Sequence, residues 1–284
     1  MKWRGRRKSD NIGKSSGSGG GGGLALGGGG IIIALVVLFL TGDPMAALRS
    51  GVGTPTETSH EEYVLSPEEE ELYDYSAVVL ADTEDAWSDI LGAQGMAYEP
   101  AGMEVFKGSV NTGCGYATSG VGPFYCSLDK KLYMDLSFIN SLVTDFGAKE
   151  GDFIVSYVIS HEVGHHVQNL TGIMDNYQEA MRKLPEREQN ALTVRLELQA
   201  DYLAGVVARY QYDQGYLEEG DMDEAISTAW AIGDDTIQKR GQGYVVPESY
   251  THGTSEQRMR WYQKGFKAGD LSGWDTFSLR PNDL

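Results

Sequence analysis

Residues 161–165 place two histidines four positions apart, with a glutamate between them, in the order His161-Glu162-x-x-His165. Residues at this spacing share one face of a helix, with Cβ atoms about 5–6 Å apart. His161 and His165 can therefore each place a nitrogen about 2.0–2.1 Å from one zinc ion. Glu162 is turned about 100° around the helix, which places its carboxylate beside the open coordination position. There it would act as the general base for an attacking water. Two exposed histidines at a helix end are the alternative, but the apolar residues 152–160 disfavour it.

A catalytic zinc ion needs a third protein ligand, and the sequence offers one on a later helix. The metzincin arrangement places a histidine six residues after the second ligand, but that position is Thr171. Glu197, which lies 32 residues after His165, is the predicted third ligand. Asp201 follows one turn later and is predicted to accept the N–H of a ligand histidine, preferably His161. A solvated carboxylate pair is the alternative, but the apolar residues that follow disfavour it.

Several elements must position these side chains. Apolar residues spaced three and four apart predict helices over 152–170, 186–212, 222–239 and 255–267. An earlier helix begins at Ser66, because Ser66 and Glu69 form a capping box and Pro67 occupies the first helical position. This helix is expected to run to about residue 91, with Asp82 as a candidate break. Residues 103–138 resemble short strands separated by turns. The predicted fold class is therefore α+β, with a small antiparallel sheet and several helices.

The N-terminal part has a different composition from the rest of the chain. Residues 1–23 are Gly-rich and hold six basic residues against Asp10, a net charge of +5, so the remainder of the −18 chain carries −23. Residues 24–40 are uncharged and 17 residues long, which favours a transmembrane signal-anchor. Because the basic residues precede it, the N-terminus is expected in the cytoplasm and the rest outside. A cleaved signal peptide or a buried core segment is the alternative.

This pattern predicts four parts and one compartment. They are a cytoplasmic tail at 1–23, a membrane segment at 24–40, a flexible linker at 41–65 and a catalytic domain at 66–284. The chain would be a single-pass inner-membrane protein whose catalytic domain is extracytoplasmic, in the periplasm or on the cell surface. The acidic body argues against nucleic-acid binding, which needs a basic face.

The chain has two cysteines, Cys114 and Cys126. Two cysteines exclude an all-cysteine zinc site and a scaffold of many disulfides. Outside the cytoplasm they are expected to form one disulfide, which closes a loop of about a dozen residues. Two buried free thiols are the alternative, and they would fit only if the predicted topology were wrong.

Several long motifs together resemble the bacterial putative neutral zinc metallopeptidase family, the YpfJ-type proteins. The matching segments are 1–7 (MKWRGRR), 9–11 (SDN), 122–126 (GPFYC), 157–168 (YVISHEVGHHVQ), 197–201 (ELQAD) and 251–258 (THGTSEQR). The resemblance covers nearly the whole chain, and it implies a zincin-like, gluzincin-type domain.

His252 takes its expected role from a second resemblance. Residues 252–258 are similar to a histidine-bearing segment that follows the third ligand in integral-membrane glutamate-zincins. That similarity implies that His252 stabilises the oxyanion or binds substrate. The alternative is a structural histidine that caps the last helix. His166 faces about 100° away from His165 and is expected to support or pack beside the site.

The sequence thus predicts a membrane-anchored zinc endopeptidase with one Zn²⁺ per chain and a peptide or protein substrate. A catalytically silent zinc-binding envelope protein is one alternative. A zinc amidase that acts on another envelope substrate is the other, because the motif specifies the water chemistry and not the acyl group. The sequence does not specify an oligomeric state.

Overall fold

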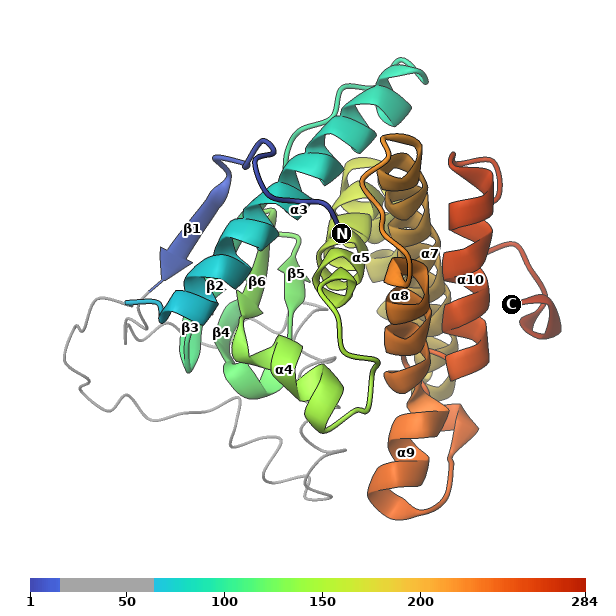
Figure 1. Cartoon of the computed structure of the whole chain (residues 1–284). Coiled ribbons are helices and arrows are strands. Elements are labelled where there is room, and N and C mark those ends of the chain that lie inside the picture. The colour runs from blue at the N-terminus through green and yellow to red at the C-terminus, as the bar shows by residue number, and fades with distance from the viewer. Residues whose placement is uncertain (16–63) are drawn as a thin grey trace.

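The computed structural model describes residues 1–15 and 64–284, which form a body with a sheet on one side and a helical layer on the other (Figure 1). The strands are β1 (Ile12–Ser15), β2 (Gly102–Phe106), β3 (Ser109–Thr112), β4 (Gly115–Thr118), β5 (Phe124–Cys126) and β6 (Lys131–Asp135). The helices are α3 (Pro67–Gly92), α4 (Ser137–Thr144), α5 (Phe153–Leu170), α6 (Ile173–Met181), α7 (Glu186–Asp213), α8 (Asp221–Ala231), α9 (Asp234–Gln242) and α10 (Ser255–Ala268). The predicted α+β class is confirmed.

The main sheet has the strand order β1-β2-β6-β5 and is mixed. Both β1 and β6 pair parallel with β2, whereas β5 pairs antiparallel with β6. The predicted antiparallel sheet is therefore wrong for this layer. Parallel neighbours need a crossover of a dozen or more residues, and residues 107–130 supply it between β2 and β6. That crossover contains the β3–β4 hairpin, which is antiparallel and forms a sheet of its own.

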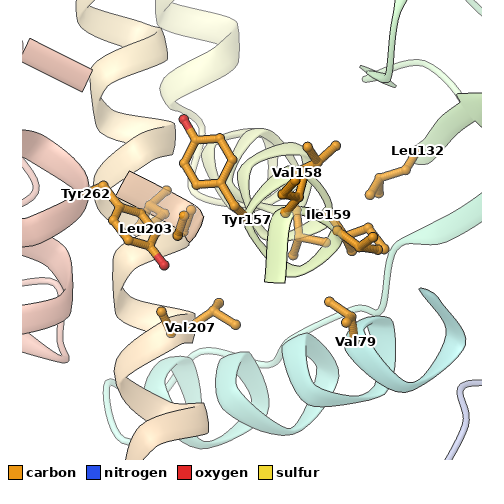
Figure 2. Close-up of a cluster of buried hydrophobic side chains, with 14 of the residues drawn as sticks. Val79, Leu132, Tyr157, Val158, Ile159, Leu203, Val207 and Tyr262 are labelled. Carbon is orange, nitrogen blue, oxygen red and sulfur yellow. The ribbon is translucent and has the colours of Figure 1, made fainter. Parts of the chain in front are cut away.

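Helix α5 runs through the centre of the hydrophobic core. Its side chains Tyr157, Val158 and Ile159 are buried between α3, α7, α10 and the sheet (Figure 2). A helix that is apolar on nearly all sides must be covered on all sides, which explains why other helices, α8 among them, and the sheet surround it. Figure 2 shows Leu132 of β6 on one side of α5 and Leu203 of α7 on the other. The residues that precede the histidine motif are therefore held in a rigid environment.

Helix α3 begins at the predicted capping box and continues without a break. Ser66 Oγ accepts the N–H of Glu69, and the Glu69 carboxylate accepts the N–H of Ser66. Asp82, the candidate break, is buried inside the helix with Arg6 and Gln211 as partners. The helix continues through Asp82 because these partners satisfy the buried carboxylate.

The helices predicted over 152–170, 186–212 and 255–267 match α5, α7 and α10 within one residue at each end. The helix predicted over 222–239 is instead two helices, α8 and α9, separated at Ile232 and Gly233. Asp234, at the start of α9, accepts three backbone N–H groups from residues 251–253. These long-range bonds favour a new helix start at this point. Helices α4 and α6 were not predicted.

Residues 1–15 belong to the folded body. Strand β1 pairs with β2, and the ring of Trp3 packs 5.4 Å from that of Tyr75 in α3. The predicted division placed residues 1–23 in a tail apart from the domain at 66–284, whereas the described residues 1–15 pack on that domain. The predicted membrane segment at 24–40 and nearly all of the linker at 41–65 lie outside the described residues. Within residues 1–15 and 64–284, no helix combines the length and the apolar character needed to cross a bilayer.

Candidate metal centre

Helices α5 and α7 bring the three predicted metal ligands together. His161 and His165 project from α5 and Glu197 from α7, and all three side chains are buried. His161 Nε2 lies 3.1 Å from one carboxylate oxygen of Glu197, and His165 Nε2 lies 3.5 Å from the other. Ligand atoms about 2.0–2.1 Å from a tetrahedral zinc ion are about 3.3–3.4 Å apart, so these separations suit zinc.

Gly164 allows the two helices to approach closely at the site. It lies on α5 between the two histidines and faces Ala200 of α7. A Cβ atom at position 164 would lie 3.1 Å from the Ala200 carbonyl oxygen, which is tighter than an ordinary contact. The close approach keeps the Glu197 carboxylate within ligand distance of both imidazoles.

The second nitrogen of each imidazole is held by an acceptor. Asp201 Oδ1 lies 2.9 Å from His161 Nδ1, and Gln168 Oε1 lies 2.8 Å from His165 Nδ1. The Gln168 amide group is itself oriented, because its nitrogen donates to the Leu196 carbonyl. These contacts favour a proton on each Nδ1, so each Nε2 atom, once it has lost its own proton, can direct a lone pair to a metal ion beside Glu197. Two neutral imidazoles and one carboxylate are a donor set that binds zinc.

Asp201 accepts from three side chains on two helices. Besides His161, its carboxylate accepts from the Tyr157 hydroxyl at 2.6 Å and from Arg258 at 2.9 and 3.0 Å. Burial alone raises the pKa of Asp201, but Arg258 and His161 outweigh it and lower that pKa to about 2. The carboxylate therefore stays charged and fixes the His161 ring.

Arg258 and Tyr157 complete the hydrogen-bond network around Asp201, and the sequence alone did not assign them. Both are buried, and the Arg258 guanidinium also contacts the Tyr157 hydroxyl at 3.1 Å. The sequence feature that could have indicated Arg258 is its place in the motif at 251–258. Its partner Asp201 is 57 positions away, so spacing alone could not join them.

In the metal-free site, His161 holds a proton strongly. Burial lowers the pKa of His161, but the Asp201 and Glu197 carboxylates outweigh it and raise that pKa to about 10. Burial raises the pKa of Glu197, but His165 and His161 reverse this and hold it well below its ordinary value. A metal ion that binds here must displace the proton of His161.

Glu162 is the acidic residue of α5 beside the two histidines, and it is partly exposed. Burial of its carboxylate raises the pKa of Glu162 above its ordinary value, although the two neighbouring histidines oppose the shift. A carboxylate whose pKa is moved towards neutrality is a better proton acceptor and donor at physiological pH.

His252 lies in the loop before α10, where Asp234 holds it. Asp234 accepts the backbone N–H of His252 at 2.7 Å, and its other carboxylate oxygen lies 3.4 Å from His252 Nδ1. His252 is close enough to Glu197 for their charges to interact. Helix α10 is capped by Thr254 and Gln257, so capping is not the task of His252.

His166 joins α5, here called the metal helix because it carries His161 and His165, to the edge strand β5. Its Nδ1 atom lies 2.9 Å from the Tyr125 hydroxyl, and its Nε2 atom lies 2.7 Å from the Glu99 carbonyl oxygen. Asn169, one turn later, donates to the same Tyr125 hydroxyl at 2.9 Å. Strand β5 is the last strand in the sheet order, so one of its sides has no strand neighbour within the described parts of the chain.

Cys114 and Cys126 form the expected disulfide. Cys126 ends β5, and Cys114 lies in the turn of the β3–β4 hairpin. The bond therefore fastens the hairpin to the edge strand that His166 holds. The Cys126 end of the disulfide is buried and packs against Phe106 and Val110.

Comparison with known proteins places the chain in a family. The sequence profile of a family described as "putative neutral zinc metallopeptidase" matches residues 1–277. The chain belongs to this family. The matched region runs from the N-terminus, before β1, to beyond the end of α10.

Two curated relatives illustrate the extent of the similarity. "Uncharacterized protein YpfJ" of Escherichia coli (strain K12) is 43% identical over 286 residues, which cover 98% of this chain and 99% of the relative. "Uncharacterized protein Rv2575" of Mycobacterium tuberculosis (strain ATCC 25618 / H37Rv) is 45% identical over 186 residues, 62% of each chain. No solved structure matches the chain.

Proposed function

We propose that this protein is a zinc-dependent endopeptidase. The observation that carries the proposal is the buried convergence of His161, His165 and Glu197, with Glu162 beside it on α5. Zinc binding alone does not require Glu162, whereas hydrolysis by an attacking water does. Membership of the neutral zinc metallopeptidase family supports the same conclusion.

The reaction divides among a few side chains. A zinc ion bound by His161, His165 and Glu197 would supply a Lewis acid that polarises the scissile carbonyl and acidifies the attacking water. Glu162 takes the proton from that water and gives it to the leaving amine. His252 is the candidate donor to the developing oxyanion, since Asp234 holds it near Glu197.

We propose a peptide or protein substrate in an extended conformation. Strand β5 offers an unpaired side at the edge of the sheet within the described residues, and the Tyr125–His166 contact joins this strand to the metal helix. Main-chain pairing with such an edge aligns a peptide with little dependence on its sequence. The net charge of −18 disfavours nucleic acid as a partner.

We also propose that the catalytic body lies outside the cytoplasm and is attached to a membrane through residues 24–40. The Cys114–Cys126 disulfide supports an oxidising compartment. The apolar length of residues 24–40 supports attachment.

The proposal is tested by comparing the wild-type protein with Glu162→Gln after each has been loaded with zinc. Both should bind one zinc ion per chain. The wild type should cleave an unfolded protein substrate, lose activity when a chelator removes the metal, and regain it when zinc is restored. Glu162→Gln should be about 10²–10⁴-fold slower, because it has lost the proton acceptor. A zinc-loaded wild type that cleaves no peptide bond would rule out a peptidase.

A further inference from the structure

Residues 1–15, here called the N-terminal strap, end in β1, which is an outer strand of the main sheet. Strand β1 pairs in parallel with β2 over four residues, from Ile12 opposite Met103 to Ser15 opposite Phe106. The pairing starts one residue earlier, where the Met103 N–H donates to the Asn11 carbonyl at 2.8 Å. Figure 1 shows the strap running alongside α3 and ending in β1 at the edge of the sheet.

Side chains of the strap meet acidic groups of α3. Arg7 contacts Glu84 at 2.8 Å and Asp85 at 2.7 Å. The buried Glu84 also accepts from Ser9 at 2.5 Å and from Asn11 at 2.7 Å. Three strap side chains thus converge on Glu84 and tie the strap to one turn of α3. Each of these three contacts comes from a different residue of the strap, so the strap is held at several points.

The strap also connects to the interior of the catalytic body. Arg6 pairs with Asp82, whose other carboxylate oxygen accepts from Gln211 of α7 at 2.9 Å. Gln211 in turn accepts from the Ser156 hydroxyl at 2.9 Å, and Ser156 is on α5, five residues before His161. Asp82, Gln211 and Ser156 are all buried. The strap is thus the outer end of a hydrogen-bonded chain that reaches the metal helix.

The ion pairs change how the basic residues of the strap should be interpreted. Four of the six basic residues in 1–23 pair with carboxylates of α3. The pairs are Arg4–Glu71, Arg6–Asp82, Arg7–Glu84 and Lys8–Asp74. The positive-inside rule predicts that basic residues which precede a membrane segment lie in the cytoplasm. Here their partners belong to the catalytic body itself.

The strap and the catalytic body lie at opposite ends of the apolar segment in sequence but side by side in space. Ser15 is paired in the sheet, and the chain resumes at Val64 within the same body. Paired strands are about 4.7–4.9 Å apart. A single crossing of the bilayer by residues 24–40 would separate the two flanks by about 30 Å of hydrocarbon. Docking of the strap and a single crossing are therefore mutually exclusive.

We propose that the strap and residues 64–284 lie on the same side of the membrane, with the strap docked on its own chain. Residues 24–40 then attach the protein to the membrane without carrying the chain from one side of the bilayer to the other. This topology replaces the one expected from the charge pattern, in which the N-terminus is cytoplasmic and the catalytic domain is not. The proposal does not depend on peptidase activity.

Cross-linking in native membranes tests the topology. Gly13 and Glu104 are paired in register, and a Cβ atom at position 13 would lie 3.6 Å from the Glu104 carboxylate. The full chain with Gly13→Cys and Glu104→Cys should be joined within one molecule by a short bismaleimide in the membrane fraction. Gly13→Cys with Tyr244→Cys, in the exposed loop after α9, is the matched control and should not be joined.

The labelling pattern supplies the opposing outcome. In the single variants Gly13→Cys and Glu104→Cys, a maleimide that cannot cross membranes should reach both cysteines from the same side once docking is loosened by mild denaturant. Labelling of the two positions from opposite sides, together with no cross-link, would overturn the proposal. A cross-link that joins two chains instead of one would overturn docking within the chain.

Discussion

Replacement of Asp201 by asparagine tests whether this residue fixes the metal-binding histidine. The carboxylate accepts from His161, Tyr157 and Arg258, and one of its oxygens serves all three. An asparagine side chain offers one carbonyl oxygen and no charge. Removal of a partner that orients a ligand histidine usually weakens metal binding by about 10–100-fold. That range corresponds to about 1.4–2.7 kcal/mol of binding free energy.

The same substitution should also destabilise the metal-free fold. Arg258 is buried, and Asp201 is its carboxylate partner in the structure. Loss of one member of a buried ion pair costs about 3–5 kcal/mol. Tyr157→Phe is the matched control, because it removes one donor to Asp201 and leaves the charge pair intact. It should cost about 1–3 kcal/mol of stability and change the zinc affinity less.

Two measurements separate these effects. Competition with a chromophoric chelator gives the zinc dissociation constant of each variant. Denaturant unfolding in excess chelator gives the stability of the metal-free protein, free of the contribution of bound metal. If Asp201→Asn lost stability but bound zinc within twofold of the wild type, Asp201 would be a structural residue only, and the orientation of His161 would have another origin.

Three further predictions concern the metal-free site, the packing of α7 and the disulfide. The pKa of His161 is raised to about 10, so in the metal-free protein this group stabilises the fold below pH 6.5 and that contribution is lost as the pH rises to about 10. Zinc affinity should rise at least tenfold per pH unit over most of that interval, with at least one proton released per zinc, because the pKa of His165 is also raised by Glu197. Calorimetry in buffers of different ionisation enthalpy measures the protons released. Gly205→Ala should cost about 3 kcal/mol in denaturant unfolding, the upper end of the usual cost of overpacking, because its Cβ would lie 2.0 Å from the Tyr262 carbonyl oxygen of α10. A neutral effect would show that α7 and α10 are not packed as described. Cys114→Ser with Cys126→Ser should cost about 3 kcal/mol, because the unfolded chain then lacks the loop that the disulfide closes across 12 positions, and equal unfolding midpoints would contradict this.

The sequence predicted best what depends on nearby residues. The capping box at Ser66, the helix that carries His161 and His165, and the disulfide are encoded within short segments. Glu197 was also found, because a zinc site with two histidines requires one more ligand and the helix around Glu197 is largely apolar. Asp201 was found in the same way, one turn further along that helix.

What the sequence did not predict depends on contacts between distant segments. Arg258 and Asp234 have partners that no spacing rule relates to them. Residues 12–15 form a strand because the edge of β2 accepts them, and nothing in their own pattern requires a parallel neighbour. The charge pattern of 1–23 predicted a free tail because the acidic partners on α3 could not be read from that segment alone.

The location of bound zinc is the most direct test of the metal centre. Crystals grown with one equivalent of zinc should be measured on both sides of the zinc absorption edge. A single anomalous peak is expected about 2.0–2.2 Å from His161 Nε2, His165 Nε2 and a Glu197 oxygen. Zinc bound elsewhere, or no peak between α5 and α7 at full zinc loading, would contradict the assignment of these three ligands.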